Sequence, residues 1–274
     1  MNIAVYINSI LKEYQALQAE ITTLLAQNHF HFKLITEEQL TDWADILIVL
    51  GGDGSILKMA RLAACLNIKV LAINAGNLGF LAEFEKSNLN EAVQFLKSGK
   101  FHLDTRPLLA CNVNGVEYLA VNEIVLHADY VYYTHQHCLE DNANDSKVLR
   151  ATVQLDGQVA TNLTASGLLV STPTGSTAYS LSAGGAVLTP NLPAFIFTPI
   201  NANSLTSKPI VYDNSSVITI DLQDKSANAI LMCDGKNIAR LQNSTTIQIY
   251  KAKESVTYIR QMESNFFEKL RKKS

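Results

Sequence analysis

The chain has 274 residues, a length that favours two domains over one or three. Hydrophobic residues make up 47% of the sequence and charged residues 17%, so the composition allows well-filled cores and argues against a disordered chain. The net charge of −3 gives no general electrostatic reason to bind nucleic acid or an acidic membrane. We interpret the basic cluster at residues 269–273 as a solvated helix end rather than a nucleic-acid patch.

Residues 1–7 carry no basic segment followed by a long apolar run, so we expect no secretory signal. No stretch reaches the roughly eighteen apolar residues that a membrane-spanning helix needs, and no membrane partner is expected. The cysteines are too widely spaced for a disulfide framework or a zinc site: Cys65, Cys111, Cys138 and Cys233. These features predict a cytoplasmic protein with reduced cysteines.

Strand-like and helix-like segments alternate over the first hundred residues. Strands are expected at 2–7, 45–50 and 68–73, and the apolar run DILIVL at 45–50 is typical of a strand buried on both faces of a parallel sheet. Helices are expected at 10–25, 55–66 and 88–98, the first from apolar residues at helical spacing. This alternation predicts βαβ units and a parallel sheet.

From about residue 101 the pattern becomes β-rich, with short segments separated by turn residues at 116–126, 148–155, 167–171, 216–222 and 245–250. Residues 112–115 and 155–158 are typical of hairpin turns. An amphipathic helix is expected at 263–273, and the polar stretch 140–147 is expected to be a mobile loop.

This change of pattern predicts two domains. Residues 1–100 are expected to form an α/β domain, which the segment 252–274 completes. Residues 101–251 are expected to form a predominantly β domain.

The strongest signal for chemistry is the turn Gly51, Gly52, Asp53, Gly54 and Ser55, between a buried strand and a helix. Glycines let main-chain amides approach a ligand closely, and a helix N-terminus attracts phosphate. A carboxylate in such a turn suits a base that accepts a proton from an attacking hydroxyl, or a ligand for Mg²⁺. The alternative is a tight turn in which Asp53 or Ser55 caps the next helix.

A second group is STPTGSTAYSLSAGG at residues 171–185, which follows a short apolar strand and is expected to open a helix. Pro173 stiffens the turn, Gly175 permits close approach, and Tyr179 offers a flat face on which a base can stack. Five hydroxyl residues within seven positions favour a binding segment over an ordinary capped helix, and those facing a ligand are expected to be Thr174, Ser176 and Thr177.

The third group is Asn122 and Glu123, which interrupt a run otherwise suited to burial. Two buried polar side chains need partners. An amide beside a carboxylate can read a purine edge and a ribose diol, although a bulge or a sheet edge explains the pair equally well when it is taken alone.

Together and in this order, the three groups resemble the NAD kinase family. The resemblance consists of GGDG at 51–54, INAGNLGFL at 73–81, NE at 122–123, the segment at 171–185 and, more weakly, CDGK at 233–236. GGDG is shared with lipid kinases and phosphofructokinases, so the identification depends on the long Thr/Ser/Tyr segment combined with NE.

The resemblance implies a nucleotide-binding α/β domain, a dinucleotide-binding β domain, an active site in a cleft between them, and a homo-oligomer, either a dimer or a tetramer. It also implies transfer of a phosphoryl group from ATP, with Mg²⁺ or another divalent cation, to the 2′-hydroxyl of the adenosine ribose of NAD. Asp53 would be the general base. The other residues expected at the nucleotides are Gly51, Gly52, Gly54, Lys58, Asn122, Glu123, Ser166, Thr174, Thr177, Ala178, Tyr179, Ser180, Leu181, Ser182 and Lys236.

The sequence departs from the family pattern at two of these positions. Ser166 stands where the family usually has an aspartate that contacts the dinucleotide, often from a neighbouring subunit, and Lys236 stands where a glutamine is frequent. Lys58 is expected to face the pyrophosphate or, alternatively, to be a solvated helix lysine. His135, His137 and Cys138 have ligand chemistry but no recognisable metal-site spacing, and no metal site is predicted from them.

Two other functions remain open on the sequence. A lipid kinase could share the GGDG turn, but no exposed apolar or basic amphipathic stretch predicts membrane docking. A non-catalytic dinucleotide-binding protein would fit Ser166, but such a protein gains little from Asp53 beside phosphates. The sequence does not decide between ATP and polyphosphate as donor, or between NAD and NADH as acceptor.

Overall fold

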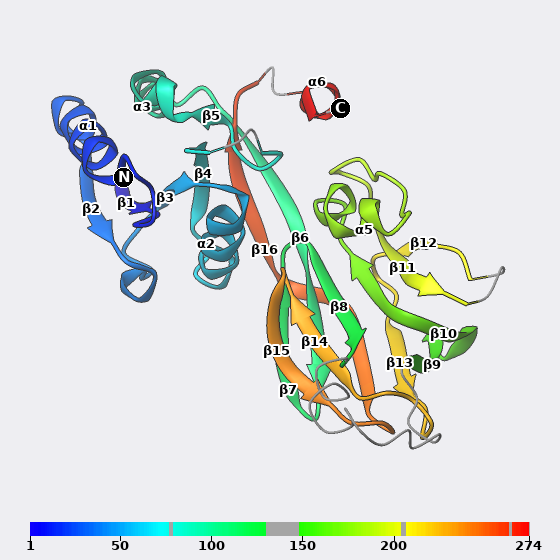
Figure 1. The fold of residues 1–274 in the computed structure, drawn as a ribbon. Helices are drawn as coiled ribbons and strands as arrows, with labels where there is room; N and C mark the ends of the chain where they lie inside the picture. The colour runs from blue at the N-terminus through cyan, green and yellow to red at the C-terminus, as the bar shows by residue number, and fades with distance from the viewer. Residues whose placement is uncertain (77–78, 130–147, 204–206, 263–264, 274) are drawn as a thin grey trace. The chain divides into compact units, whose positions relative to one another are not determined.

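A computed structural model describes residues 1–76, 79–129, 148–203, 207–262 and 265–273. The chain forms two units, the first made of Met1–Arg106 and Glu254–Ser274 and the second of Pro107–Lys253. Two long strands, β6 (His102–Val113) and β16 (Thr246–Arg260), each begin in one unit and end in the other. The first unit therefore contains both ends of the described chain (Figure 1).

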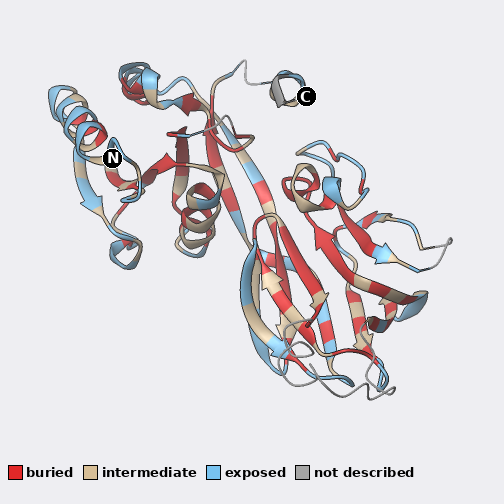
Figure 2. Ribbon diagram, in the orientation of Figure 1, coloured by how far each residue is buried: buried red, intermediate tan, exposed pale blue. Residues whose placement is uncertain are grey.

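The first unit is built on a parallel sheet with the strand order β16-β4-β3-β1-β2. Its members besides β16 are β1 (Asn2–Ile7), β2 (His31–Ile35), β3 (Ile46–Gly51) and β4 (Lys69–Asn74), and β5 (Phe84–Glu85) pairs with β4. Every residue of β3 is buried, because helices cover both faces of a central parallel strand. Figure 2 shows the central strands in red and the edge strand β2 mostly in pale blue.

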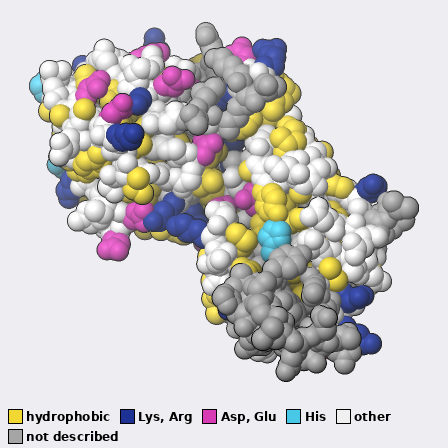
Figure 3. Space-filling view, in the orientation of Figure 1, with side chains coloured by type: hydrophobic (Ala, Val, Ile, Leu, Met, Phe, Trp, Pro, Cys, Tyr) yellow, Lys and Arg dark blue, Asp and Glu magenta, His cyan; other side chains and the backbone are white. Residues whose placement is uncertain are grey.

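The helices of this unit are α1 (Tyr14–Gln27), α2 (Asp53–Cys65), α3 (Leu89–Ser98) and α6 (Phe266–Lys273), with short 3₁₀ turns η1 (Glu37–Gln39) and η2 (Lys86–Asn88). Apolar residues of α1 and α3 share one core with Ile46, Ile48 and Leu50 of β3. Leu47 and Val49 alternate with these and face the opposite side of the sheet, where α2 buries Met59 among other residues. On the face shown in Figure 3, side chains of both charges are interspersed over this unit.

All six elements expected in the first hundred residues are present, with shifted ends. The first helix begins at Tyr14 rather than at residue 10, because the Leu11 and Tyr14 amides donate to the carbonyls of Asn8 and Leu11 in turns that precede it. The edge strand β2 was not expected, since none of its residues is buried and its apolar signal is weak. The closing helix begins at Phe266 rather than at residue 263.

The second unit is an antiparallel β structure with the strand order β15-β14-β8-β10-β9-β13-β16. Strand β11 pairs with β10 and with β12, and β6 forms a hairpin with β7. These strands are β7 (Val116–Ala120), β8 (Glu123–Ala128), β9 (Leu149–Leu155), β10 (Gln158–Ser171), β11 (Ala194–Ala202), β12 (Ile210–Asp213), β13 (Ile218–Leu222), β14 (Ala229–Cys233) and β15 (Lys236–Leu241).

Three hairpins of this unit turn on an Asx-Gly pair with positive φ. Asn114 and Gly115 have φ of 52° and 79°, and Asp156 and Gly157 have 49° and 78°, as two-residue hairpin turns require. The expected turns at 112–115 and 155–158 are therefore confirmed. The third pair, Asp234 and Gly235, joins β14 to β15 and belongs to the CDGK motif, whose hairpin geometry the sequence analysis did not identify.

The predicted fold class is confirmed: an N-terminal α/β unit with a parallel sheet and a C-terminal unit that is mostly antiparallel β. Several β elements are longer or more numerous than expected. The expected strand 167–171 is the end of β10, and 245–250 is the start of β16. The buried cysteines Cys111 and Cys233 are core residues. Within the described ranges no helix is long and apolar enough to cross a membrane.

Candidate functional site

The turn that carries Asp53 is formed where β3 runs into α2. Gly51 ends the strand, Gly52 is the extended N-cap residue, and the amides of Ser55 and Ile56 donate to the Gly52 carbonyl at 3.0 and 3.1 Å. A Cβ at Gly51 would lie 2.7 Å from that of Ser55, so this glycine allows the turn to close on itself. Gly52 and Gly54 have nothing within 4 Å on the corresponding side, so their backbone is open to a ligand.

Asp53 is the first residue of α2, not a cap two residues before the helix. The helix begins at Asp53 rather than at Ser55, and its N-cap is Gly52 with no side-chain cap hydrogen bond. The alternative in which Asp53 caps a helix that starts at Ser55 is therefore wrong. The Asp53 carboxylate lies against Gly79, where an added Cβ would overlap it. Gly79 is therefore the neighbour that leaves room for this carboxylate.

Two asparagines that the sequence analysis did not single out hold the surroundings of this turn. Asn8, just after β1, donates from Nδ2 to Ser55 Oγ at 2.9 Å. Asn74, which is 3% exposed at the end of β4, exchanges two hydrogen bonds of 3.1 Å with the backbone of Gly76. The carboxyl ends of β1, β3 and β4 thus meet around Asp53, as parallel strands place them at one edge of a sheet.

Lys58, on the second turn of α2, forms an ion pair with Glu37 of η1. Both side chains are about one-third exposed, at 32% and 30%. Lys58 is therefore tied to a neighbouring carboxylate, and its expected contact with a pyrophosphate stays a prediction.

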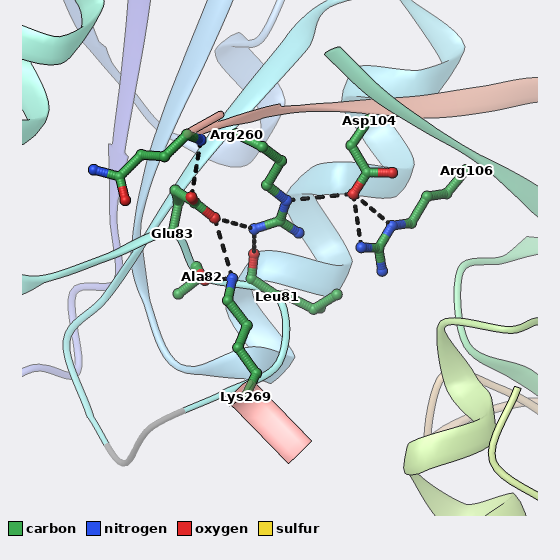
Figure 4. Close-up of polar contacts among 8 residues, drawn as sticks. Leu81, Ala82, Glu83, Asp104, Arg106, Arg260 and Lys269 are labelled. Atoms are coloured by element: carbon green, nitrogen blue, oxygen red, sulfur yellow. Dashed lines mark hydrogen bonds and ion pairs between the residues drawn. The ribbon is translucent and has the colours of Figure 1, made fainter. Parts of the chain in front are cut away.

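Sequence reasoning missed a group of largely buried charges around Glu83, a residue of the segment that follows Gly79 (Figure 4). Arg260, at the end of β16, contacts Glu83 and Asp104, and Lys269 of α6 also contacts Glu83. Asp104 is further paired with Arg106 at 2.7 Å. The partners come from widely separated parts of the chain, and no local pattern relates them.

In the second unit, the expected pair Asn122 and Glu123 forms the corner between β7 and β8. Asp234 holds this corner from the hairpin of β14 and β15. Its carboxylate accepts hydrogen bonds from the amides of Val121 at 2.9 Å, Asn122 at 2.7 Å and Glu123 at 3.3 Å. The Asp234 amide in turn donates to the Glu123 carbonyl at 3.1 Å. The weak CDGK motif is therefore the anchor of the NE motif.

Glu123 is 6% exposed, and its Oε2 atom finds no hydrogen-bond partner in the part of the chain that the structure describes. Burial, and then the nearby Asp234 charge, raise the pKa of Glu123 to about 8. Glu123 is therefore mostly protonated at neutral pH and carries a donor. Asn122 Oδ1 is also buried and unpartnered among the described residues. Such unsatisfied polar atoms are uncommon in proteins, and a bound polar ligand would satisfy them.

The Thr/Ser segment packs directly on this corner. Thr172 donates its hydroxyl to the Val121 carbonyl at 2.7 Å, and its amide donates to the Asn122 carbonyl at 2.9 Å. A Cβ at Gly175 would overlap the Asn122 backbone, so only glycine allows this close approach. Two motifs fifty residues apart in the chain thus form one surface.

The segment opens a helix, as expected, but that helix is short. It forms a 3₁₀ turn, η3 (Gly175–Thr177), and a single helical turn, α5 (Tyr179–Ser182). Ser176 and Ser180 are fully buried: Ser176 bonds to the backbone of Pro173 and Leu188, and Ser180 bonds to Thr198 at 3.1 Å. These hydroxyls shape the turn. The more exposed members of the expected set are Thr177, Ala178, Tyr179, Leu181 and Ser182, while Thr174 is 8% exposed.

Tyr179 lies beside His127 of β8, a residue that the sequence analysis did not identify. The His127 Nε2 and Tyr179 hydroxyl atoms are 2.8 Å apart, and the two rings are stacked at 5.8 Å between centroids. Burial lowers the pKa of His127, partly offset by a hydrogen bond with the Ser166 backbone. Ser166 is half-buried in β10, so this position adjoins the residue that orients Tyr179.

The remaining expected residues are peripheral or outside the described ranges. Lys236 is exposed at the start of β15. His135, His137, Cys138 and the stretch 140–147 lie outside the described residues. Asp129, at the end of the described residues that precede them, pairs with Arg240 at 3.4 Å. No cluster of three or more His, Cys, Asp or Glu side chains suited to a metal ion occurs among the residues described.

Comparisons with known proteins agree with these features. Residues 3–101 match the family model "ATP-NAD kinase N-terminal domain", and residues 138–261 match "ATP-NAD kinase C-terminal domain". A protein named NAD kinase from Colwellia psychrerythraea is 34% identical over 270 residues, covering 96% of this chain and 87% of its own length. A second protein of that name, from Corynebacterium diphtheriae, is 34% identical over 85% of this chain and 71% of its own.

Solved structures share the fold. The crystal structure of yeast NADH kinase complexed with NADH has a TM-score of 0.82 and 24% sequence identity, and the match covers 99% of this chain and 86% of that one. An NAD kinase from Archaeoglobus fulgidus in complex with ATP has a TM-score of 0.77 at 24% identity, and the match covers 99% of both chains.

Proposed function

The chain belongs to the NAD kinase family, and on that premise we propose that it transfers the terminal phosphoryl group of ATP to the 2′-hydroxyl of the adenosine ribose of NAD, with Asp53 as the general base. The oxygen–phosphorus bond to the ribose forms as the bond from the γ-phosphorus to the bridging oxygen of ADP breaks. The proton of the hydroxyl passes to the Asp53 carboxylate. The products are NADP and ADP.

The observation that carries this proposal is the position of Asp53 at the open turn after β3. A ribose hydroxyl is a poor nucleophile at neutral pH, and a positioned base typically contributes about a hundredfold to ten-thousandfold. Asp53 is flanked by Gly52 and Gly54, whose backbone is open, and it faces Gly79, which adds no side chain. An acceptor hydroxyl and donor phosphates could approach this carboxylate over the open backbone of Gly52 and Gly54.

The residues of this turn also fit a divalent cation bound together with ATP. Carboxylate and phosphate oxygens are the ligands that Mg²⁺ prefers, and the N-terminus of α2 favours phosphate. Asp53 would hold the cation with the nucleotide. When bound, the ion would neutralise charge that develops on the transferred phosphoryl group.

For the dinucleotide we propose the corner at Asn122 and Glu123 together with Tyr179. The unpartnered Asn122 Oδ1 is a hydrogen-bond acceptor, and a protonated Glu123 is a donor. The pair can therefore bind one donor group and one acceptor group of an adenosine. The stacked Tyr179 ring, held by His127, offers a face for a base. Thr174, Thr177, Ala178, Leu181 and Ser182 would complete the wall, with Ser166 and Lys236 toward the distal half and Lys58 at the pyrophosphate.

The same family pattern leads us to propose a cytoplasmic homo-oligomer in which the α/β and β-rich parts act as the two domains. Ser166 in place of an aspartate would then change the contact with the distal part of the dinucleotide and leave the phosphoryl transfer unchanged.

The deciding experiment incubates purified protein with Mg²⁺ and each of the four pairs of NAD or NADH with ATP or polyphosphate, followed by an assay for the 2′-phosphorylated product. We expect NADP from NAD and ATP. Binding of NAD without product from any pair would favour the non-catalytic dinucleotide-binding protein. Phosphorylation of a diacylglycerol in mixed micelles, without NADP formation, would instead favour the lipid kinase.

A further inference from the structure

The segment 79–83, which follows the loop after β4, is held in place by side chains from the C-terminal end of the chain. Arg260 donates from Nη1 to the Leu81 carbonyl at 2.7 Å, and Lys269 donates from Nζ to the Ala82 carbonyl at 2.8 Å. The Gln261 amide donates to Glu83 Oε1 at 2.9 Å. Three successive residues of the segment are thus bound by 260–269 (Figure 4).

Glu83 contacts both cations at once. Its Oε2 atom lies 3.1 Å from Arg260 Nη1 and 3.1 Å from Lys269 Nζ, and its side chain is 2% exposed. Burial would raise the pKa of Glu83, but the charges of Lys269 and Arg260 outweigh burial and hold the pKa below its usual range. Glu83 is therefore ionised at neutral pH and binds both cations.

Arg260 is itself almost fully buried, with 3% of its side chain exposed, and it stacks over the Tyr258 ring at 4.8 Å. Its second carboxylate partner, Asp104 on β6, lies 3.4 Å away. Buried ion pairs cost desolvation and stabilise a fold little compared with apolar packing. What they supply is a defined geometry, because a displaced partner leaves a buried charge uncompensated.

The held segment begins at the residue that borders the catalytic carboxylate. Gly79 lies against Asp53 so closely that a Cβ would overlap it, and Leu81 is two residues further on. An aromatic contact also joins this segment to α6, since the ring centroids of Phe80 and Phe266 are 6.3 Å apart. The C-terminal residues therefore contact the segment on both sides of Leu81.

We propose that Arg260 and Lys269 are positioning residues for phosphoryl transfer, which fix residues 79–83 and thereby keep Gly79 in place beside Asp53. This inference rests on the proposed function of Asp53, but its structural part can be measured without any reaction. It makes the C-terminal helix a part of the catalytic arrangement, although its residues bind no substrate.

The proposal leads to a specific pH dependence. The charged groups that act on Lys269 are Arg260, Glu83 and Arg106. Burial lowers the pKa of Lys269 to about 8, with Arg260 adding to the effect and Glu83 opposing it. Lys269 is mostly charged at pH 7 and mostly neutral at pH 9, while Glu83 stays ionised. The ion pair between them, and with it the hold on the segment, should weaken across that interval.

The test compares Lys269→Met, which removes the charge and keeps an unbranched side chain one atom shorter, with Lys269→Arg, which keeps the charge to high pH. Lys97→Met on α3 is the matched control, because Lys97 is exposed and contacts Asn28 on the surface. For each protein, kcat and KM for NAD and ATP are measured from pH 7 to 9. Amide hydrogen exchange of peptides covering 79–85 is followed by mass spectrometry at pH 7.

We expect Lys269→Met to exchange faster at 79–85 and to lose roughly tenfold to a hundredfold in kcat, as small misplacements of catalytic groups do, with both KM values within twofold. Lys269→Arg should have the parental exchange rate and the parental kcat at pH 7. It should keep that kcat at pH 9, where the kcat of the parent declines. Lys97→Met should match the parent throughout.

Parental exchange at 79–85 in Lys269→Met would overturn the proposal, as would a parental kcat in that variant. A loss of kcat that Lys269→Arg does not restore would overturn it as well, since shape rather than charge would then matter. If the parent itself makes no NADP, the proposed function fails, and the exchange measurement still decides whether Lys269 holds the segment.

Discussion

The turn at Asp53 and the corner at Asn122 are both polar motifs that directly follow a strand, β3 and β7 respectively, but they use their residues differently. At Asp53 the glycines leave the backbone open, and one carboxylate lies among them. At the corner most polar groups are used internally: Thr172, Ser176 and Asp234 each bond to the backbone that they shape. The motif rich in hydroxyls is therefore largely a scaffold, whereas the glycine-rich motif leaves the backbone on both sides of its carboxylate open.

This comparison is tested most strongly at Asp53. Asp53→Asn keeps size and polarity but cannot accept the proton, so kcat should fall by about a hundredfold to ten-thousandfold. Steady-state kinetics, NAD binding and thermal unfolding should show that the KM for NAD and the Tm stay near the parent values. A variant that retains more than about a tenth of parental kcat would exclude the general-base role.

The second test concerns the glycine that faces this carboxylate. Gly79→Ala places a methyl group where Asp53 now lies, so the carboxylate must move and kcat should fall by roughly tenfold to a hundredfold. Gly76→Ala is the control in the same loop, because a Cβ there meets only Asn74 Oδ1 at 3.9 Å. Equal kinetics for the two variants would mean that Asp53 does not need its present position.

The third test asks whether Glu123 is neutral when the corner is folded. Because burial and Asp234 raise the pKa of Glu123 from 4.5 to about 8, the folded state holds a proton that the unfolded state releases. The free energy of unfolding should therefore decrease as the pH rises from about 4.5 to 8 and level off above that range.

Glu123→Gln carries no titrating group at this position, so its stability should decline less than that of the parent over the same interval. Urea unfolding of both proteins at pH 5, 7 and 9 measures the difference. Parallel pH profiles would show that Glu123 is ionised in the fold, and the corner would then present two acceptors rather than one acceptor and one donor.

The smallest effect is expected at Tyr179, where the ring and the hydroxyl can be separated. Tyr179→Phe loses only the hydrogen bond with His127, whereas Tyr179→Ala also loses the stacking face. Each contribution is about 1 kcal/mol, so KM for NAD should rise by roughly fivefold for Phe and more for Ala, with kcat little changed. Unchanged KM in both folded variants would place the dinucleotide elsewhere.

The elements with a strong local signal could be predicted from the sequence. The apolar run of β3 predicted a buried parallel strand, and the Asx-Gly pairs at 114–115 and 156–157 formed the expected hairpins. The glycine-rich turn at Asp53 and the NE pair were also found from local composition. These features depend on the conformational preferences of a few neighbouring residues, which a short stretch of sequence already expresses.

Which polar residues work together depends on the three-dimensional fold and could not be predicted from the sequence. Asp234 holds Asn122 across more than a hundred residues of chain, and Arg260 holds Leu81 and Glu83 across nearly two hundred. His127 gained its role from the neighbouring strand that brings Tyr179 to it. Hydrogen bonds and ion pairs act over a few ångströms in space, so their partners are set by strand order and register rather than by separation along the chain.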